Sequence, residues 1–539
     1  MENETTTPAY NALFVFGDSL SDNGALFALT NGAVPPVSLT GNDLDGNAVD
    51  FAARGIFYDG KFTNGDVYAE VATDLLGIAG DTSTFYDNLS GSNFAVGGAT
   101  ATDLSAFGAT ATNTFADQVA AFQNAIAALP GSAEDRAAFL SGSAASVFIG
   151  LNDLSRLAGV ATAGGSINQQ VLASGIATIV NEIAAQTQAL AASGVGTIIL
   201  NLLPGGSFFP SANTLIDAFG PGTAQLFDSV MAQVNLGLSS IAAGLSGAGT
   251  NVEVVDFFSL AQEIQADAAS FGFLTLENAL PGSNAQTTLL IDDVPIEQIG
   301  FIDPVHFTAE LHEVFGAFQA RTLGTTQIKG DDSGGITSGS DASETIFAGA
   351  GRDRVRAEDG DDLVFAGADN DVVFAGGGDD LVFGGTGNDV IFGQEGSDIT
   401  AGGSGNDILL GGDGDDIIVG NAGKDFVNGG LGDDILVDGL GSDVIFGGRG
   451  NDFAIYRAPG DIGGSAEGVE DIFFGGSGND TLLIVSDSAI ADVAAFLALN
   501  GVQVFDFETT EVITSAQLES YDFGTLGAQA HVADLMGLI

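Results

Sequence analysis

Two short stretches of this chain hold residues that together can form a serine nucleophile and its base. Ser19 lies in Gly17-Asp18-Ser19-Leu20, and Asp303 stands three residues before His306 in Asp303-Pro304-Val305-His306. A serine hydroxyl is a poor nucleophile until a base takes its proton, and the base needs an acceptor that holds it in one tautomer. We therefore predict Ser19 as the nucleophile, His306 as the base and Asp303 as the group that orients the imidazole ring.

Two further stretches offer hydrogen-bond donors for the negative oxygen that forms when a hydroxyl attacks a carbonyl. Asn93-Phe94-Ala95-Val96-Gly97-Gly98 provides a flexible backbone, and Asn152 follows an apolar run in Gly150-Leu151-Asn152-Asp153. Preorganised donors lower the energy of such an oxyanion. We expect the oxyanion hole to consist of the backbone N–H groups of Ser19 and Gly98 and the side-chain amide of Asn152.

The other histidines do not suggest a metal site. The chain has three histidines, His306, His312 and His531. His306 and His312 with nearby Glu310 have the side-chain types of zinc ligands, but residues six apart do not share a helix face, so zinc is not expected. We interpret His312 as structural or solvated and His531 as part of the tail.

The elements that must position these groups are short apolar runs separated by alanine-rich helical stretches. Strands are expected at 12–16, 146–149, 197–200 and 252–255, and helices at 116–129, 171–192, 222–245 and 308–323. Such alternation favours a mostly parallel sheet with helices on both faces, which places its site at the carboxyl ends of the strands. Residues 24–57 form a long irregular insertion after Ser19, which we expect to shape the substrate site.

In chain order, the first block is 17–20, the second 93–98, the third 150–153 and the fourth 303–306. Together they resemble the SGNH/GDSL hydrolase family over about residues 10–325. The resemblance implies a three-layer, flavodoxin-like α/β domain over 8–325 that cleaves carboxylic acyl esters through a triad and an acyl-enzyme, without an organic cofactor. It also selects Gly98 over Gly97. An ester or lipid is the expected substrate, and a phospholipase, an acyltransferase and a carbohydrate-ester deacetylase remain alternatives.

The charge balance excludes several classes of partner. The chain of 539 residues has 71 Asp+Glu against 12 Lys+Arg, a formal net charge of -59. Nucleic acids and anionic lipids attract clustered Lys and Arg, so we expect no nucleic acid and at most peripheral membrane contact. Cysteine is absent, which excludes disulfides and thiol nucleophiles. The hydrophobic fraction of 45% is enough for a buried core.

The second half of the chain is a repeat. After a polar stretch at 326–343, which we predict to be a linker, an aspartate stands at every ninth position from 353 to 452, and Asp471 and Asp480 resume the period one residue out of phase. A fixed period of this length indicates a repeat architecture, because a disordered tract would not keep phase. These aspartates are the predicted metal ligands: Asp353, Asp362, Asp371, Asp380, Asp389, Asp398, Asp407, Asp416, Asp425, Asp434, Asp443, Asp452, Asp471 and Asp480.

Each repeat has the form G-G-x-G-x-D-x-U-x, where U is apolar, as Val364, Val382 and Ile391 are. Glycine permits positive φ, and U is expected to point into a narrow core. Carboxylate and carbonyl oxygens of stacked turns suit Ca²⁺, which takes six to eight oxygen ligands. We predict several structural Ca²⁺ ions, whose binding drives the folding of this half.

The repeats resemble RTX calcium-binding repeats, which form an all-β parallel β-roll, here expected over 344–484. The resemblance implies export by type I secretion machinery and a secreted or cell-surface location. The N-terminus shows neither the basic nor the apolar part of a secretory signal peptide. Residues 485–539 would then be a cap plus a secretion signal. A different class of function, a calcium-dependent adhesin or surface protein without catalysis, also stays open.

Many repeats are apolar on both sides of U, as in Leu363-Val364-Phe365 and Ile417-Ile418-Val419. A roll needs only U inside, so a second apolar face is expected. That face either packs against the rest of the chain or mediates self-association or adsorption to a lipid–water interface.

Overall fold

The computed structural model divides the chain into two compact units, Met1–Gln262 with Leu274–Leu323 and Glu263–Phe273 with Gly324–Ile539. We describe each unit by itself. The residues that the structure describes are 10–18, 40–42, 48–50, 67–76, 78, 93–96, 99–103, 113–162, 167–209, 222–271, 273, 275–278, 299–301, 308–458, 471–486, 488–518, 521 and 523.

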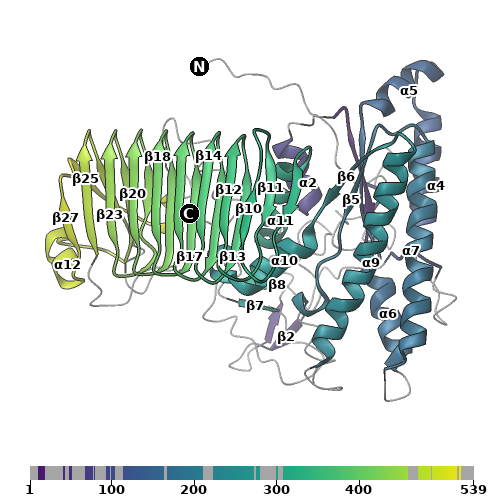
Figure 1. Cartoon of the computed structure of the whole chain (residues 1–539), viewed down its shortest axis with the longest axis horizontal. Helices are drawn as coiled ribbons and strands as arrows, with labels where there is room; N and C mark the ends of the chain where they lie inside the picture. Colours follow the sequence, from purple (N-terminus) through teal and green to yellow (C-terminus); the bar gives the residue numbers. More distant parts are fainter. Residues whose placement is uncertain are drawn as a thin grey trace. The chain divides into compact units, whose positions relative to one another are not determined.

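The first unit is built on a parallel sheet (Figure 1). Its strands are β1 (Leu13–Gly17), β4 (Ala144–Phe148), β5 (Thr197–Asn201) and β6 (Asn251–Val255), in the order β1-β4-β5-β6. Every residue of β1, β4 and β5 is buried, as expected of short apolar strands between two helical layers. A parallel bridge from Val15 to Asn93 sets residues 93–96 on the other side of β1. The resulting order is flavodoxin-like, as predicted.

Helices cover both faces of this sheet. Figure 1 shows α4, α7 and α9 on one side and α2 and α11 on the other. Among the described residues, no helix is long and apolar enough to cross a bilayer. The helices are α2 (Tyr68–Leu75), α4 (Phe115–Ala128), α5 (Ala133–Ser141), α6 (Leu151–Thr162), α7 (Gln169–Ala192), α9 (Gly222–Gly247), α10 (Phe257–Ala266) and α11 (Ala309–Thr322), with the 3₁₀ turn η3 (Gly206–Phe208). The last residues of α10 and the 3₁₀ turn η4 (Ala268–Phe271) belong to the second unit. Two small ribbons complete the list, β2 (Thr40–Asn42) with β3 (Ala48–Asp50) and β7 (Thr275–Asn278) with β8 (Ile299–Phe301).

Aromatic packing holds the 93–96 segment against β1. The ring of Phe16 stacks on that of Phe94 with centroids 5.5 Å apart, and Phe122 of α4 meets both rings edge-on. Phe94 N–H also donates to the Val15 carbonyl at 2.8 Å. These contacts fix the start of the second sequence block next to the end of the first.

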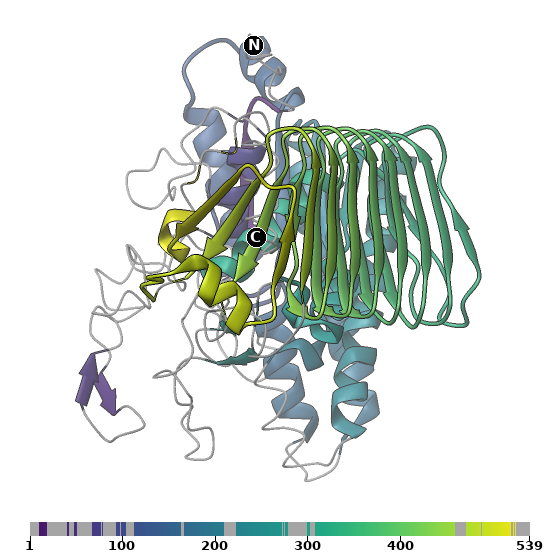
Figure 2. The same cartoon turned by 90° about the vertical axis from the view of Figure 1, so that its left-hand side faces the viewer.

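The second unit is a parallel β-roll (Figures 1 and 2), as predicted. Within the described residues, two parallel sheets alternate along the chain. Up to β24, neighbouring strands in one sheet are 18 residues apart, as in the pair Val364↔Val382, and beyond it the spacing is longer. One sheet contains β10 (Ile336–Ser338), β12 (Arg354–Asp359), β14 (Val372–Gly377), β16 (Val390–Glu395), β18 (Ile408–Asp413), β20 (Phe426–Leu431), β23 (Val444–Arg449), β25 (Ile472–Ser477) and β27 (Gln503–Phe505). The other contains β9 (Thr326–Lys329), β11 (Glu344–Phe347), β13 (Leu363–Ala368), β15 (Leu381–Thr386), β17 (Ile399–Gly405), β19 (Ile417–Gly423), β21 (Ile435–Val437), β22 (Leu440–Gly441), β24 (Phe453–Arg457), β26 (Thr481–Val485) and β28 (Thr509–Ile513).

The U positions form the core of the roll. Val364, Val373, Val382 and Ile391 are fully buried in one hydrophobic cluster. Glycine lets successive coils approach: Gly385 has φ +93°, and a Cβ added there would lie 2.1 Å from the Gly367 carbonyl oxygen. A side chain at that position would therefore push two coils apart.

The roll begins before residue 344. Residues 326–343, predicted as a linker, contain β9 and β10, which pair with β11 and β12. Ile328 lies opposite Ile346, one coil earlier, and packs against the core of the roll. Composition could not reveal this, because the turns of the roll are themselves rich in Gly, Ser and Asp.

After the last repeats the chain continues both sheets and then caps the roll. β27 pairs with β25 and β28 with β26. Between β26 and β27, the helix α12 (Val493–Leu499) places Phe496 edge-on to Tyr456 of the core, and a last short helix, α13 (Ser515–Leu518), follows β28. This arrangement accounts for a cap within 485–539. The secretion signal expected there stays a prediction, and residues 524–539 lie outside the described part.

The outward apolar residues of the two sheets differ in exposure. In the sheet of β13, Leu363 and Phe365 are each 1% exposed. Phe271 stacks on Phe383 of this sheet at 5.0 Å, and Phe523 packs edge-on against Phe453 at 5.5 Å. In the sheet of β12 the outward residues are more accessible, with Ile408 42%, Phe426 39% and Phe505 43% exposed. One apolar face is thus buried and the other is partly open.

Thr400 interrupts the apolar core of the roll and gives a stability prediction. It stands between Val382 and Ile418 in the core column, is fully buried, and its hydroxyl has no hydrogen-bond partner in the structure. Thr400→Val keeps the shape and removes the unsatisfied hydroxyl, so we expect the free energy of unfolding to rise by about 1–2 kcal/mol.

Urea unfolding of the calcium-loaded chain, followed by circular dichroism, measures this change. Thr510→Val, on the exposed side of β28, is the matched control and should change stability by less than about 0.5 kcal/mol. A lower stability of Thr400→Val than of the wild type would contradict the prediction.

Candidate functional site

The first three sequence blocks meet at the carboxyl ends of β1 and β4. Gln118 of α4 holds the end of β1: its side-chain oxygen accepts from Gly17 N–H at 3.0 Å, and its amide donates to the Gly17 carbonyl at 2.8 Å. Val96 N–H donates to the same carbonyl at 3.2 Å. The backbone that leads into Ser19 is therefore fixed from two sides, and Asp18, 1% exposed, belongs to this packed edge.

Asp153, in the third block (150–153), binds the backbone of residues 101–102, which follows the second block (93–98). Asp153, fully buried, accepts from Ala101 N–H at 2.6 Å, from Thr102 N–H at 3.0 Å and from the Thr102 hydroxyl at 2.7 Å. Burial raises the pKa of Asp153 against the lowering effect of these bonds. The network ties the first turn of α6 to residues 101–102.

Asn152, the predicted oxyanion donor, is oriented by the same segment. Its Nδ2 donates to the Ala99 carbonyl at 3.0 Å, and the side chain is half-buried. An amide nitrogen carries two hydrogens, so this bond sets the direction of the group while the second hydrogen can serve another acceptor. The structure thus brings Asn152 to the residue that follows the predicted donor Gly98.

Four of the predicted site residues lie outside the described part of the chain: Ser19, Gly98, Asp303 and His306. The insertion at 24–57 does too, apart from its short β2–β3 ribbon, and so does His531. Their roles remain predictions. The described residues that flank them are Asp18, Ala99 and Thr308. Thr308 caps α11 by accepting from Leu311 N–H at 3.4 Å.

His312 has a structural role, one of the two interpretations that its sequence position allowed. It is 1% exposed, and its Nδ1 accepts from Tyr68 N–H at the start of α2 at 3.1 Å. An imidazole that accepts through Nδ1 is not protonated there. The bond joins α11, which directly follows the Asp303–His306 block in sequence, to α2.

Sequence reasoning missed Gln118 and Asp153, which support the site without matching a catalytic pattern. Asp153 directly follows Asn152, and an acidic residue in the first turn of a helix usually serves the helix itself. Gln118 is 101 residues from its partner Gly17, so no local signal could identify it.

The predicted calcium ligands form two ladders along the roll. In each ladder the Oδ1 of one aspartate accepts from the backbone N–H of the aspartate 18 residues earlier, as Asp389 does from Asp371 at 2.7 Å and Asp434 from Asp416 at 2.9 Å. At the break in the period the step becomes 28 residues, from Asp443 to Asp471 and from Asp452 to Asp480. All fourteen predicted positions therefore take equivalent places in the roll.

The second oxygen of these carboxylates meets the requirement for a cation ligand. The Oδ2 atoms of Asp371, Asp389, Asp416 and Asp434 are buried and have no hydrogen-bond partner in the structure. Burial, as the main cause, raises the pKa of Asp371 to about 7 and that of Asp434 to about 9. A buried anionic oxygen without a partner is costly, and a hard cation such as Ca²⁺ would remove that cost. The residues thus fit the ion.

Comparison with known families agrees with this geometry. Residues 13–317 match the model of the GDSL-like lipase/acylhydrolase family. The chain belongs to the GDSL family of hydrolases. The RTX calcium-binding nonapeptide repeat matches at 338–373, 366–400, 374–409, 401–436, 428–454 and 470–482. A comparison with curated proteins found no match. The protein is thus a GDSL hydrolase with a calcium-binding RTX roll, and both predicted resemblances are confirmed.

Asp153 gives a prediction for the GDSL domain. In Asp153→Ala the Ala101 and Thr102 donors lose their acceptor, so we expect the calcium-loaded domain to lose about 2–4 kcal/mol of stability. Thermal unfolding measures the loss. Asp153→Asn keeps the shape and one acceptor oxygen and should lose less. An Asp153→Ala variant as stable as the wild type would show that the network does not fix this segment.

The ladder aspartates predict the pH dependence of the calcium-free roll. Their pKa values are raised, to about 8 for Asp389 and Asp416, so the folded state binds more protons than the unfolded state. Protonation stabilises the folded roll fully at pH values below 3.8, the pKa of aspartate in the unfolded chain. This stabilisation is lost as pH rises through the pKa values of the folded state, about 6 to 9.

We therefore expect the roll in chelator to become more stable as pH falls from about 8.5 to about 5. Saturating Ca²⁺ should remove or reverse this trend, since the ion needs ionised carboxylates. Urea unfolding at several pH values, with chelator and with Ca²⁺, tests both statements. A chelated roll that gains stability as pH rises would contradict them.

Proposed function

We propose that the protein is a secreted serine hydrolase of carboxylic acyl esters whose RTX roll folds on Ca²⁺. The observation that carries the proposal is the meeting of three GDSL blocks at the ends of β1 and β4, with Asn152 bonded to Ala99 at 3.0 Å. Family membership and the intact Asp303–His306 block in the sequence support it further.

In this proposal the Ser19 hydroxyl attacks the ester carbonyl while His306 takes its proton. Asp303 holds the His306 ring in the tautomer that can accept that proton. His306 then protonates the leaving alkoxide, and water, activated by the same base, releases the acid from the acyl-enzyme. The Ser19 and Gly98 N–H groups and the Asn152 amide stabilise the oxyanion in both halves of the reaction.

The roll has a separate task in the proposal. Its buried carboxylates oppose folding without a cation, so the chain stays loose where calcium is low and folds where calcium is abundant. RTX repeats are typical of proteins exported by type I systems, and the proposed location is extracellular or cell-surface. No step of ester cleavage passes through these ions.

Hydrolysis of p-nitrophenyl esters from acetyl to palmitoyl, with Ca²⁺ and with chelator, tests the proposal. We expect Ser19→Ala and His306→Ala to lose at least about 10³-fold in kcat. Ser174→Ala on the exposed side of α7 and His531→Ala are the matched controls and should keep wild-type rates. The chain-length profile separates an esterase from a lipase.

Asn152→Ala should lower kcat by about 10²–10³-fold if its amide serves the oxyanion. A matching loss of melting temperature would instead assign the effect to the lost Ala99 bond. If the calcium-loaded wild type cleaves no ester and an organophosphonate fails to label Ser19, the hydrolase proposal falls, and the adhesin alternative gains support.

A further inference from the structure

Two neighbouring coils of the roll depart from the three before them at the position two residues after U. Three successive coils have glycine there, at 384, 402 and 420, and the next two have Asp438 and Tyr456. The register continues through this change, with Ile418 opposite Leu436 and Leu436 opposite Ala454. Asp438 and Tyr456 are each 1% exposed. Two large side chains therefore stand inside the roll where the repeat normally has none.

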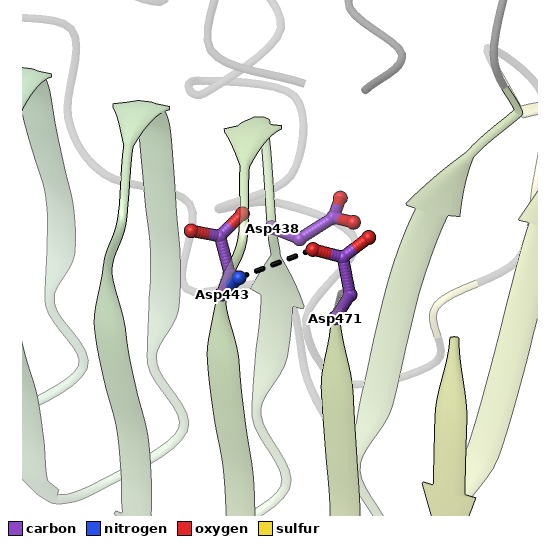
Figure 3. Close-up of side chains that lie close together, drawn as sticks. All are labelled: Asp438, Asp443 and Asp471. Atoms are coloured by element: carbon purple, nitrogen blue, oxygen red, sulfur yellow. Dashed lines mark hydrogen bonds between the residues drawn. The ribbon is translucent and has the colours of Figure 1, made fainter. Parts of the chain in front are cut away.

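Asp438 meets two aspartates of the calcium ladder (Figure 3). Carboxylate oxygens of Asp438, Asp443 and Asp471 all lie within 4.8 Å of one another. Asp471 Oδ1 accepts from Asp443 N–H at 3.1 Å, and Asp438 Oδ1 accepts from Gly439 N–H at 2.8 Å. The Oδ2 atoms of all three are buried without a hydrogen-bond partner in the structure.

Among the described residues, two basic side chains influence this cluster. Arg457, half-buried, acts on Asp438, and Lys424, exposed, acts on Asp443, each as the weakest of the influences on that carboxyl. Exposed charges are screened by water, whereas the three carboxylates are at most 1% exposed. When ionised, the three carboxylates repel one another, and a bound cation would balance their charge.

We infer that Asp438, Asp443 and Asp471 form a three-carboxylate cation site that the regular repeat lacks. At regular turns the corresponding position is glycine, and an added Cβ would come within 3.0 Å of the ladder carboxylate, as at Gly384 beside Asp389. Oxygens that share one Ca²⁺ at about 2.3–2.6 Å lie no more than about 5 Å apart, which the cluster satisfies. Affinity for Ca²⁺ rises with the number of charged ligands, so this site fills before the rest of the ladder.

Tyr456 makes the site observable. Its ring lies in the core, edge-on to Phe473 and Phe496, and the charges of Asp438 and Asp471 add to burial in raising its pKa. Asp438 N–H also donates to the carbonyl of Ile455 at 3.5 Å, so Tyr456 takes the position next to Asp438 in the neighbouring coil. Tyrosine transfers excitation to bound Tb³⁺, a probe for Ca²⁺ sites, and the chain has 6 tyrosines and no tryptophan.

The test is a Tb³⁺ titration of the calcium-free full chain, with tyrosine excitation and with bound metal counted by mass spectrometry after dialysis. The wild type should show sensitised emission that saturates at about one ion per chain, well before total binding does, and Ca²⁺ should compete it away. Tyr456→Phe should lose most of this emission and keep the same number of bound ions.

Asp438→Gly restores the residue found at 420 and should lose the early emission, because the turn then binds an ion only as weakly as the regular turns do. Asp438→Asn keeps the volume and the acceptor for Gly439, and it should weaken the first binding event by at least tenfold if the glycine variant fails to fold. Asp361→Asn, an exposed aspartate of the roll, is the matched control and should behave as the wild type. Unchanged early emission in folded Asp438→Gly and Asp438→Asn would overturn the inference.

Discussion

The roll depends on one repeated contact, the hydrogen bond from a backbone N–H to the aspartate Oδ1 of the next coil in the same sheet. The bond sets the register of stacked coils, because each aspartate must lie beside the N–H 18 residues before it, as Asp389 lies beside Asp371. It also turns the other carboxylate oxygen into the interior. Coil stacking and cation binding are therefore the same structural event, which is why the calcium-free roll is expected to be unstable at neutral pH.

The GDSL domain solves a different problem, which is to hold donors from distant parts of the chain at one edge of a sheet. Parallel strands place the ends of β1 and β4 side by side, but buried polar side chains set the details. Gln118 forms two hydrogen bonds with the backbone of Gly17, and Asp153 accepts hydrogen bonds from the backbone of residues 101–102. Gln118 and Asp153 are fully buried, so each of these donors and acceptors needs its partner.

Irregularities in the roll are informative because the surrounding coils show what the regular structure requires. Thr400 replaces an apolar residue and leaves its hydroxyl without a hydrogen bond. Asp438 and Tyr456 replace glycine and add side chains to the interior. The first is a local loss of stability, whereas the second brings Asp438 beside Asp443 and Asp471. The same fold thus contains both a defect and a candidate special site.

Local signals in the sequence determined the four strands, the repeat period and the four chemical blocks, because each depends on residues close in the chain. Only the tertiary structure showed that 326–343 belongs to the roll, since turn and linker compositions are alike. It alone brought Asn152 to Ala99, Gln118 to Gly17 and Asp438 to Asp471. These pairs are formed by coil stacking and strand order. Their members are far apart in the chain, so no local or periodic pattern in the sequence predicts that they meet.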